Sequence, residues 1–514
     1  MLPVALDEDG GLSSSPSSDP PRVAADDPTS RRRLLRWWPV AAVAAVALMG
    51  GQAVLDQRER AALDRLRNLP GVLLPLDASM RELWRTDDLS GIPSAGVGSD
   101  FAIGAMRPDG SQVVRLVDGP TGGVRWELPV TGAETALPEE RSWNGPYCAS
   151  ATDGLLACRV ADQYEVGSDA TSLLQPTEPD TPVPTRSRLV VIDSSARRVV
   201  AEHPTSFREP ATVTSDLFVV GDAAQDQSIV LEAADLRTGE VRWRRTLAAA
   251  PAEDGEVDIT PAAPDANVMS TWLSALPDGR LLVHHHQTDW VLSSSGDVLQ
   301  EVASTQQGSA LQHVRGSTFL ITPWNGVGRA SLLLPDGSRT QTSGWPLGLS
   351  VDDGSAPGQC FLTDGGLLVV NCATGAQLWD TEVAQPSGGI LLDGILYLSS
   401  GAWVVALDTH QHRTLWTWER EGRGVAWDGL FTDGRDLYVL DWRADADAPA
   451  FDRNSTGSFR VVTLSTEDGS ELWAAPLDVR AQSDDVWAMA LAGRLLVREM
   501  SATGTMPIRV FGSG

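Results

Sequence analysis

The stretch Leu236–Thr246, LRTGEVRWRRT, carries the pattern that decides the fold. Its composition is typical of a strand, a tight Thr-Gly turn and a second strand that contains Trp243. Similar units recur at Leu76–Thr86, Asp118–Leu128, Asn371–Thr381, Leu407–Trp418 and Ser465–Ala475. A unit that recurs this widely predicts a repeat architecture.

Short apolar or β-branched runs separated by Asp-Gly turns continue from Val72 to Gly514, which predicts an all-β protein. Grouping the runs by period gives units at 100–130, 147–203, 216–247, 272–302, 312–343, 347–383, 393–420 and 433–477. Val486–Phe511 supplies inner strands and Val72–Asp87 an outer strand, so these two terminal segments would share one further blade and close a ring.

This grouping yields nine units, but three of them, 147–203, 272–302 and 312–343, lack the motif tryptophan. We expect one of these three to be misgrouped. The prediction is therefore an eight-bladed β-propeller, with seven blades as the alternative.

The tryptophan that follows each turn is expected on the outer strand of its blade. There its ring can pack against the next blade while the indole N–H donates to a backbone carbonyl. We interpret six tryptophans as docking residues between blades: Trp84, Trp126, Trp243, Trp379, Trp416 and Trp473.

The sequences TGEVRW (238–243), TGAQLW (374–379) and DGSELW (468–473) resemble the docking motif of the pyrroloquinoline-quinone-like repeat family. That family includes quinoprotein alcohol dehydrogenases and the outer-membrane assembly-factor propeller. The resemblance covers about Val72–Gly514 and is weak in Trp272–Ser343. It implies the fold, but the fold hosts both enzymes and scaffolds.

Members of the family that bind the quinone usually have a disulfide between adjacent cysteines, a flat tryptophan under the cofactor, and a Glu/Asn/Asp calcium cluster with a catalytic aspartate. This chain has no adjacent cysteine pair, and we assign none of its residues to the calcium cluster. We therefore expect no cofactor, no metal and no catalytic residue.

The N-terminal part has a different composition. Residues 1–30 are rich in Ser, Pro and Asp and are expected to be a disordered cytoplasmic tail. Residues 31–55 combine an arginine cluster with Trp37–Leu55, 19 residues without a charge, which is long enough for a transmembrane helix. Residues 56–71 are expected to form a stalk helix, followed by the propeller at 72–514.

The arginine cluster predicts a cytoplasmic N-terminus and an extracytoplasmic propeller. Two alternatives to a transmembrane anchor stay open. The apolar segment could be a buried helix of a soluble protein, or it could belong to a signal peptide cleaved after Ala45-Val46-Ala47.

The formal net charge of the chain is -28, which makes nucleic acid an improbable partner because its phosphates would be repelled. All 40 basic residues are arginine, and Ala, Gly and Asp are common. This composition suggests a GC-rich genome such as that of an actinobacterium.

Each of two cysteine pairs brackets one predicted hairpin. We predict the disulfides Cys148–Cys158 and Cys360–Cys372, which suit an exported protein. Buried free thiols are the alternative. A zinc site is disfavoured because no CxxC spacing occurs.

Two clusters of polar residues are candidate metal sites. His284 and His286 would share one face of a strand and could begin a metal site, although a polar strand face is the simpler interpretation. A second group offers oxygen ligands suited to calcium, but its spacing fits no EF-hand, and we favour a solvated acidic loop. Its members are Asp441, Asp445, Asp447, Asp452 and Asn454.

Four long loops interrupt the tight pattern: Thr131–Pro146, Val166–Ser187, Ala248–Asn267 and Arg443–Ser458. By their position between strands, all four are expected on one face of the ring, and a partner is expected there. We predict a non-catalytic binding or scaffolding protein of the cell membrane, whose partner is a cell-envelope protein or another extracytoplasmic ligand. A quinone-dependent dehydrogenase with an atypical site and a membrane-anchored ligand sensor are the alternatives.

Overall fold

The structure is a computed structural model that describes part of the chain, and the account below concerns only the described residues. Isolated described residues at 63, 66, 67 and 69 precede the segments 71–86, 93–107, 109–132, 145–166, 182–205, 211–223, 228–248, 271–285, 288–303, 309–323, 330–383, 386–400, 403–420, 429–444, 456–482, 486–499 and 507–513. The predicted tail and transmembrane segment, 1–55, lie outside these residues. No described helix is long and apolar enough to cross a membrane.

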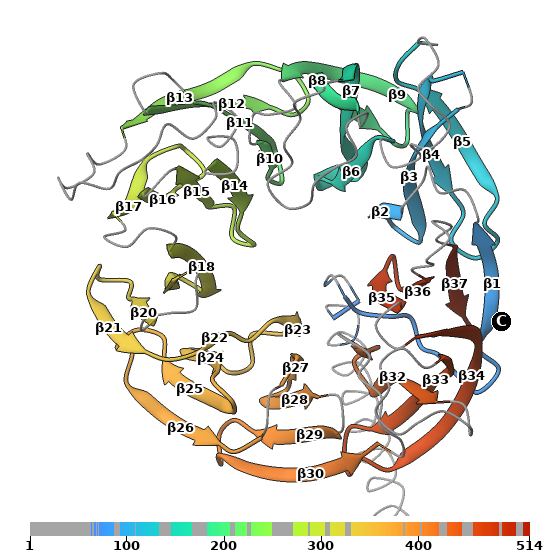
Figure 1. Ribbon diagram of the computed structural model, residues 1–514, viewed down its shortest axis with the longest axis vertical. Coiled ribbons are helices and arrows are strands. Elements are labelled where there is room, and N and C mark those ends of the chain that lie inside the picture. The colour runs from blue at the N-terminus through green and yellow to red at the C-terminus, as the bar shows by residue number, and fades with distance from the viewer. Residues whose placement is uncertain are drawn as a thin grey trace, which may run out of the picture. The chain divides into compact units, whose positions relative to one another are not determined.

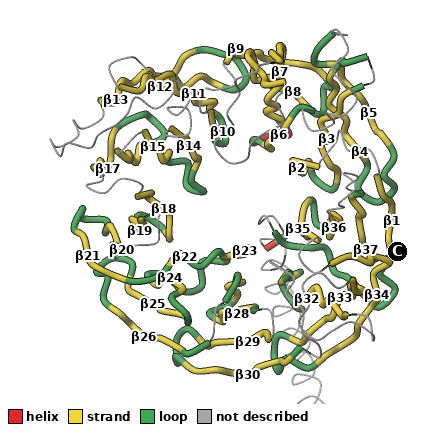
Figure 2. The backbone as a smooth tube through the Cα atoms, viewed as in Figure 1, coloured by secondary structure: helices red, strands yellow, loops and turns green. Residues whose placement is uncertain are grey.

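The chain divides into two compact units, Met1–Leu63 and Asp64–Gly514. The described strands of the second unit form nine sheets that follow one another round a ring (Figure 1). Strands and the turns between them account for nearly all of this ring (Figure 2). The predicted β-propeller is confirmed, but eight blades, or seven, was the wrong number.

The first four blades run from Pro93 to Ala303. They comprise β2 (Pro93–Val97), β3 (Asp100–Met106), β4 (Gln112–Val117) and β5 (Val124–Pro129); β6 (Tyr147–Ser150), β7 (Leu155–Val166), β8 (Pro182–Asp193) and β9 (Arg198–Thr205), with the 3-10 turn η1 (Thr152–Gly154); β10 (Ala211–Val213), β11 (Leu217–Ala223), β12 (Ser228–Asp235) and β13 (Val241–Ala248); and β14 (Thr271–Ala275), β15 (Leu281–His285), β16 (Thr288–Leu292) and β17 (Val298–Ala303).

The remaining five blades follow in chain order, and the last one also takes in the first strand. They comprise β18 (Ser309–Arg315), β19 (Thr318–Pro323), β20 (Ala330–Leu333) and β21 (Arg339–Thr342); β22 (Trp345–Pro346), β24 (Gln359–Thr363), β25 (Leu367–Asn371) and β26 (Gln377–Thr381); β23 (Leu349–Asp352), β27 (Gly388–Leu392), β28 (Ile395–Ser399), β29 (Trp403–Asp408) and β30 (Arg413–Glu419); β31 (Leu430–Thr432), β32 (Asp436–Ala444), β33 (Thr456–Ser465) and β34 (Glu471–Gln482); and β35 (Val486–Leu491), β36 (Arg494–Glu499), β37 (Ile508–Gly512) and β1 (Arg81–Thr86).

The two ends of the propeller share the ninth blade, as predicted from the sequence. β1 is its outer strand and pairs antiparallel with β37, so Trp84 lies opposite Val510. Arg509 ties the two ends together by pairing with Glu82 at 2.9 Å and with Glu499 at 2.7 Å. Figure 1 accordingly shows the C-terminus beside β1.

Side chains of the outer strands link each blade to the next. The indole N–H of Trp243 donates to the carbonyl of Ser294 in the following blade at 2.9 Å. The ring lies so close under the turn that a Cβ at Gly296 would approach it to 2.7 Å. Trp84 lies in the same way against Gly119 and Gly122, and Trp416 against Thr466 and Gly469, with N–H to carbonyl distances of 2.7 and 3.1 Å.

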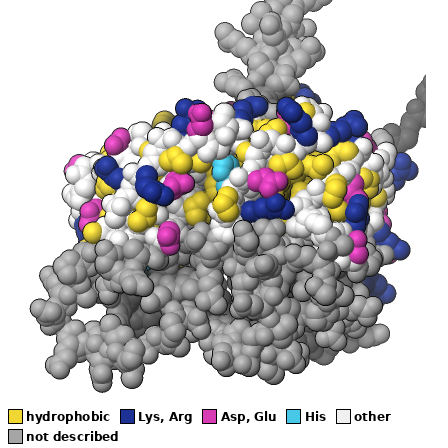
Figure 3. Space-filling view, turned by 90° about the horizontal axis from the view of Figure 1, so that it is seen from above, with side chains coloured by type: hydrophobic (Ala, Val, Ile, Leu, Met, Phe, Trp, Pro, Cys, Tyr) yellow, Lys and Arg dark blue, Asp and Glu magenta, His cyan; other side chains and the backbone are white. Residues whose placement is uncertain are grey.

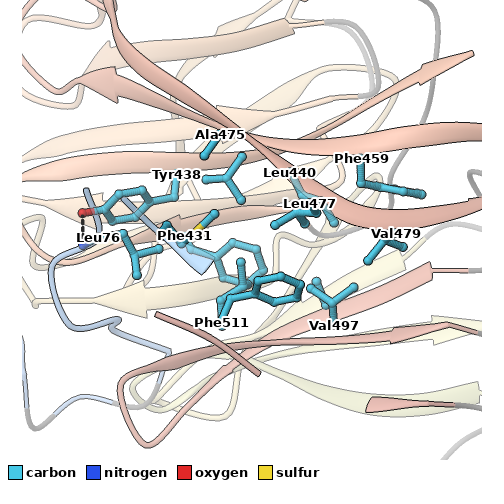
Figure 4. Close-up of a cluster of buried hydrophobic side chains, with 14 of the residues drawn as sticks. Leu76, Phe431, Tyr438, Leu440, Phe459, Ala475, Leu477, Val479, Val497 and Phe511 are labelled. Carbon is cyan, nitrogen blue, oxygen red and sulfur yellow. Dashed lines mark hydrogen bonds between the residues drawn. The ribbon is translucent and has the colours of Figure 1, made fainter. Parts of the chain in front are cut away.

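The other three motif tryptophans also lie at blade junctions. Trp379 stacks on His412, which occupies the turn of the next blade with φ +55°, and their ring centroids are 5.4 Å apart. Trp126 is buried in a cluster with Leu156 and Ile192 of the next blade. Trp473 packs against a buried cluster that joins the eighth and ninth blades. Figure 4 shows members of this cluster, among them Tyr438 and Phe511.

The three blades without the motif tryptophan use other side chains for the same contact. His203 packs under Gly239, where a Cβ would lie 3.2 Å from its ring. Gln300 donates its side-chain N–H to the carbonyl of Leu334 at 3.2 Å. Thr340 lies against Gly375 of the following blade. These other side chains explain the wrong blade number, because the prediction had discounted one of the three units for its lack of the tryptophan.

Both predicted disulfides are present. Cys148 and Cys158 lie directly opposite each other on β6 and β7. Cys360 on β24 bonds to Cys372, which follows β25. Each disulfide therefore joins two neighbouring strands of one blade, the first and second in the second blade and the second and third in the sixth.

Two turn glycines provide a matched test of the docking contact. Gly296 and Gly337 have nearly equal φ angles, +81° and +83°, but a Cβ at Gly337 would meet nothing within 4 Å. We expect Gly337→Ala to lower the free energy of unfolding by about 1–2 kcal/mol through backbone strain alone. Gly296→Ala should cost about 2–5 kcal/mol because it also displaces Trp243. Equal shifts in urea unfolding would contradict the docking role.

The His203 junction should weaken in acid. Burial lowers the pKa of the His203 imidazole below its usual range, with a smaller opposing effect from Glu232. The unfolded state therefore binds the proton more tightly. The stabilisation is complete above about pH 6.5, the unfolded pKa, and is lost as the pH falls from there through the lower pKa of the folded state. Unfolding midpoints at pH 7.5 and 5.5 should differ less in His203→Phe than in the native chain. An unchanged difference would show that His203 does not contribute.

Candidate functional site

A cavity of about 430 Å³ lies among the inner strands of the seventh, eighth and ninth blades. Its walls include Leu349 of β23, Phe431 of β31 and the four successive residues 487–490 of β35. β31 has only three residues, whereas the inner strands on either side, β27 and β35, have five and six. The cavity is thus bordered by inner-strand residues of all three blades.

Small residues shape the opposite wall. The cavity is lined there by Gly348, Gly388 and Gly389, and a Cβ at Gly389 would meet Leu349 at 3.1 Å. Gly71 also borders the cavity with φ +87°, and a Cβ there would lie 2.5 Å from the carbonyl oxygen of Ser350. Backbone therefore approaches backbone closely at this wall.

The lining is apolar and uncharged. None of the described residues that line the cavity is an acid, a base or a cysteine. Two of its serines are engaged locally: Ser350 donates to the carbonyl of Gly389 at 3.3 Å, and Ser387 to that of Ser399 at 3.1 Å. Such a surface suits the binding of an apolar group.

The segment that leads into β1 is held beside this cavity. Leu73 donates its N–H to the carbonyl of Thr432 at 2.8 Å, and Leu74 to that of Gly493 at 2.7 Å. Leu76 N–H donates to the hydroxyl of Tyr438 at 3.1 Å (Figure 4), which itself donates to Asp433. Burial raises the pKa of the Tyr438 phenol far above its usual value, so it remains a donor.

The histidines predicted as a possible metal site already have partners. His284 is buried on β15, where its Nδ1 lies 2.8 Å from the carboxylate of Asp289 and its ring stacks on Trp272. Burial raises the pKa of the Asp289 carboxyl despite this pairing. His285 bonds to Thr271, while His286 lies outside the described residues. Across the described segments, no group of three or more His, Cys, Asp or Glu could hold a metal.

Asp441 is not placed to bind a cation. It is fully buried, and its carboxylate lies 2.7 Å from Nε of Arg460 and 3.3 Å from Nε of Arg420. Arg443 lies 3.6 Å away on the same strand. The other proposed oxygen ligands, Asp445, Asp447, Asp452 and Asn454, lie outside the described residues.

The four long loops join strands as expected. Two connect the second and third strands of a blade, β7 to β8 and β32 to β33, and two connect successive blades, β5 to β6 and β13 to β14. In an up-and-down blade both kinds of connection leave from the same face. Most residues of these loops lie outside the described part of the chain. Seen from the rim, the described surface intersperses basic, acidic and apolar side chains (Figure 3).

The fold is thus a β-propeller with an apolar cavity on its inner strands. Residues 328–505 match the family model of the outer membrane protein assembly factor BamB. The resemblance to the pyrroloquinoline-quinone-like repeat family inferred from the sequence is thereby confirmed in this segment, which runs from β20 to β36. No curated protein sequence matches the chain.

Solved structures of propellers resemble this chain distantly. BamB from Moraxella catarrhalis is 12% identical to this chain with a TM-score of 0.37. The matched region covers 72% of this chain and 97% of the BamB chain. Quinohemoprotein alcohol dehydrogenase ADHIIG from Pseudomonas putida HK5 is 11% identical to this chain with a TM-score of 0.38. The matched region covers 88% of this chain and 79% of the dehydrogenase chain.

The burial of Asp441 yields a stability test. Asp441→Asn removes the anion between buried arginines and should lower the free energy of unfolding by about 3–5 kcal/mol. Asp278→Asn, which breaks an exposed pair with Arg280, is the control and should cost about 0–1 kcal/mol. Calcium should not raise the unfolding midpoint through Asp441. A calcium-dependent rise that disappears in Asp441→Asn would contradict this assignment.

Proposed function

We propose that the chain is a membrane-tethered, extracytoplasmic propeller that binds another protein and performs no catalysis. The observation that carries this proposal is the cavity on the inner strands, which is apolar and free of titratable side chains among its described residues. The match of residues 328–505 to an assembly-factor family model supports a binding role. The partner is a protein of the cell envelope.

The membrane tether rests on the sequence. Trp37–Leu55 is long enough to span a bilayer, and the arginines that precede it favour a cytoplasmic N-terminus. The two disulfides support an oxidising compartment for the propeller, because such bonds persist mainly outside the cytoplasm.

Topology is tested with alkaline phosphatase, which is active only outside the cytoplasm. A fusion after Gly514 should be active, and a fusion after Ser30 should be inactive. Replacing Arg31, Arg32, Arg33 and Arg36 by Asn should lower the activity of the first fusion several-fold, because the arginines orient the helix. Loss of the N-terminal residues from the mature protein would instead favour a cleaved signal peptide.

Binding is tested in living cells with a photo-crosslinking amino acid at position 487, inside the cavity. Position 345 is the matched control, because Trp345 is an exposed tryptophan on another inner strand. We expect an envelope protein, identified by mass spectrometry, to crosslink at 487 and not at 345. Equal products at both positions would overturn the role of the cavity.

The alternative of a quinone-dependent dehydrogenase is tested separately. The purified chain is incubated with pyrroloquinoline quinone and calcium, and dye-linked alcohol oxidation is measured. We expect no bound chromophore and no oxidation above the buffer rate. Activity at a fixed stoichiometry of quinone would overturn the non-catalytic assignment.

A further inference from the structure

We propose that the inner edge of β35 binds an extended, uncharged and apolar segment of a protein partner as an added parallel strand. This inference rests on the proposed function of the cavity and specifies what the cavity binds. Three features support it. The backbone edge of β35 faces the cavity, the two preceding inner strands each pair with an added parallel segment, and the cavity walls are apolar and uncharged.

The cavity touches the edge of β35 and not one of its faces. Successive side chains of a strand point to opposite faces, so a cavity against one face would be lined by every second residue. Here four successive residues, Trp487, Ala488, Met489 and Ala490, line it. Ala488 packs towards the eighth blade, whereas Met489 packs towards the first. The backbone edge between these two faces is therefore turned to the cavity.

The two preceding inner strands already accept extended segments in this way. β23 pairs in parallel with β27 in the seventh blade, bringing Leu349 opposite Gly389. In the eighth blade, Val72 forms a parallel bridge with Thr432 of β31. β35 is the next inner strand round the ring, and it ends its sheet without a further strand partner among the described residues. An unpaired strand edge is a template for adding a strand.

The walls select the chemistry of the added strand. Trp487 is 43% exposed, although it lies among apolar residues of the cavity. Since no described lining residue is charged, a charged side chain would be desolvated there without a partner. β35 has six residues, so an added strand that follows its whole length would span about 20 Å. The occupant is therefore a short extended segment with apolar side chains at alternate positions.

The test uses the full chain in nanodiscs and a fluorescent peptide, acetyl-Ser-Val-Thr-Val-Thr-Val-Ser-amide, with binding followed by anisotropy. Gly348→Trp should lower affinity at least tenfold, because a Cβ at Gly348 meets no atom within 4 Å and the larger side chain would fill the cavity without displacing the fold. Trp487→Ala should also weaken binding. Trp345→Ala, the control, should leave the affinity unchanged.

Strand addition is separated from simple apolar binding by a second peptide that carries N-methyl groups at alternate amides. This change keeps the side chains but removes the N–H donors along one edge, so affinity should fall at least tenfold for one of the two methylation registers. Equal binding of the native and both methylated peptides would overturn the proposal. So would binding that Gly348→Trp and Trp487→Ala leave unchanged, or no peptide binding.

The peptide-binding and crosslinking experiments together distinguish failure of strand addition from failure of the proposed function. If the cavity binds a folded partner surface, the crosslink at position 487 persists while the peptide does not bind. If the chain is not a binding protein that uses this cavity, the site-specific crosslink is also lost.

Discussion

The ring depends on one repeated contact, in which an outer-strand side chain packs under the tight turn of the next blade. At Trp243 this contact has two components. The aromatic face lies against Gly296, and the indole N–H donates to the carbonyl of Ser294. Large aromatic rings bury much apolar surface, and the donated N–H satisfies a backbone acceptor at the same junction. Under Trp84, Trp243 and Trp416 the turn carries a glycine with positive φ, where a Cβ would meet the indole ring. Under Trp379 the turn residue is His412, whose ring stacks on the indole instead.

This pairing explains what could be predicted from the sequence. The Gly-x-x-x-Trp units identified a propeller because turn and outer strand lie side by side in the chain. The contact itself joins one blade to the next, so a blade with a different docking side chain gives no local signal. His203, Gln300 and Thr340 take that place in the three blades that lack the tryptophan. The number of blades was therefore mistaken while the architecture was correct.

The cavity could not have been found by the same reasoning. It is lined by the inner strands of three consecutive blades, which the intervening outer strands separate in the sequence, and by Gly71 from the other end of the propeller. The only local hint is the alternation of large and small residues in Trp487-Ala488-Met489-Ala490, which is also typical of an ordinary buried strand. The polar clusters that drew attention instead, His284 and Asp441, are engaged in buried pairs with Asp289 and with arginines.

The shared ninth blade has a consequence for the order in which the chain is made. β1 emerges early in synthesis, but Arg509, the partner of Glu82, lies 427 residues later. The ring can therefore close only after nearly the whole polypeptide has been synthesised. Closing so large a loop has a high entropic cost, which makes closure a late step in folding. The disulfides, which join cysteines only 10 and 12 residues apart, can form before that moment and hold single blades together. A chain truncated before β37 therefore cannot close the ring, because it lacks the strand with which β1 pairs.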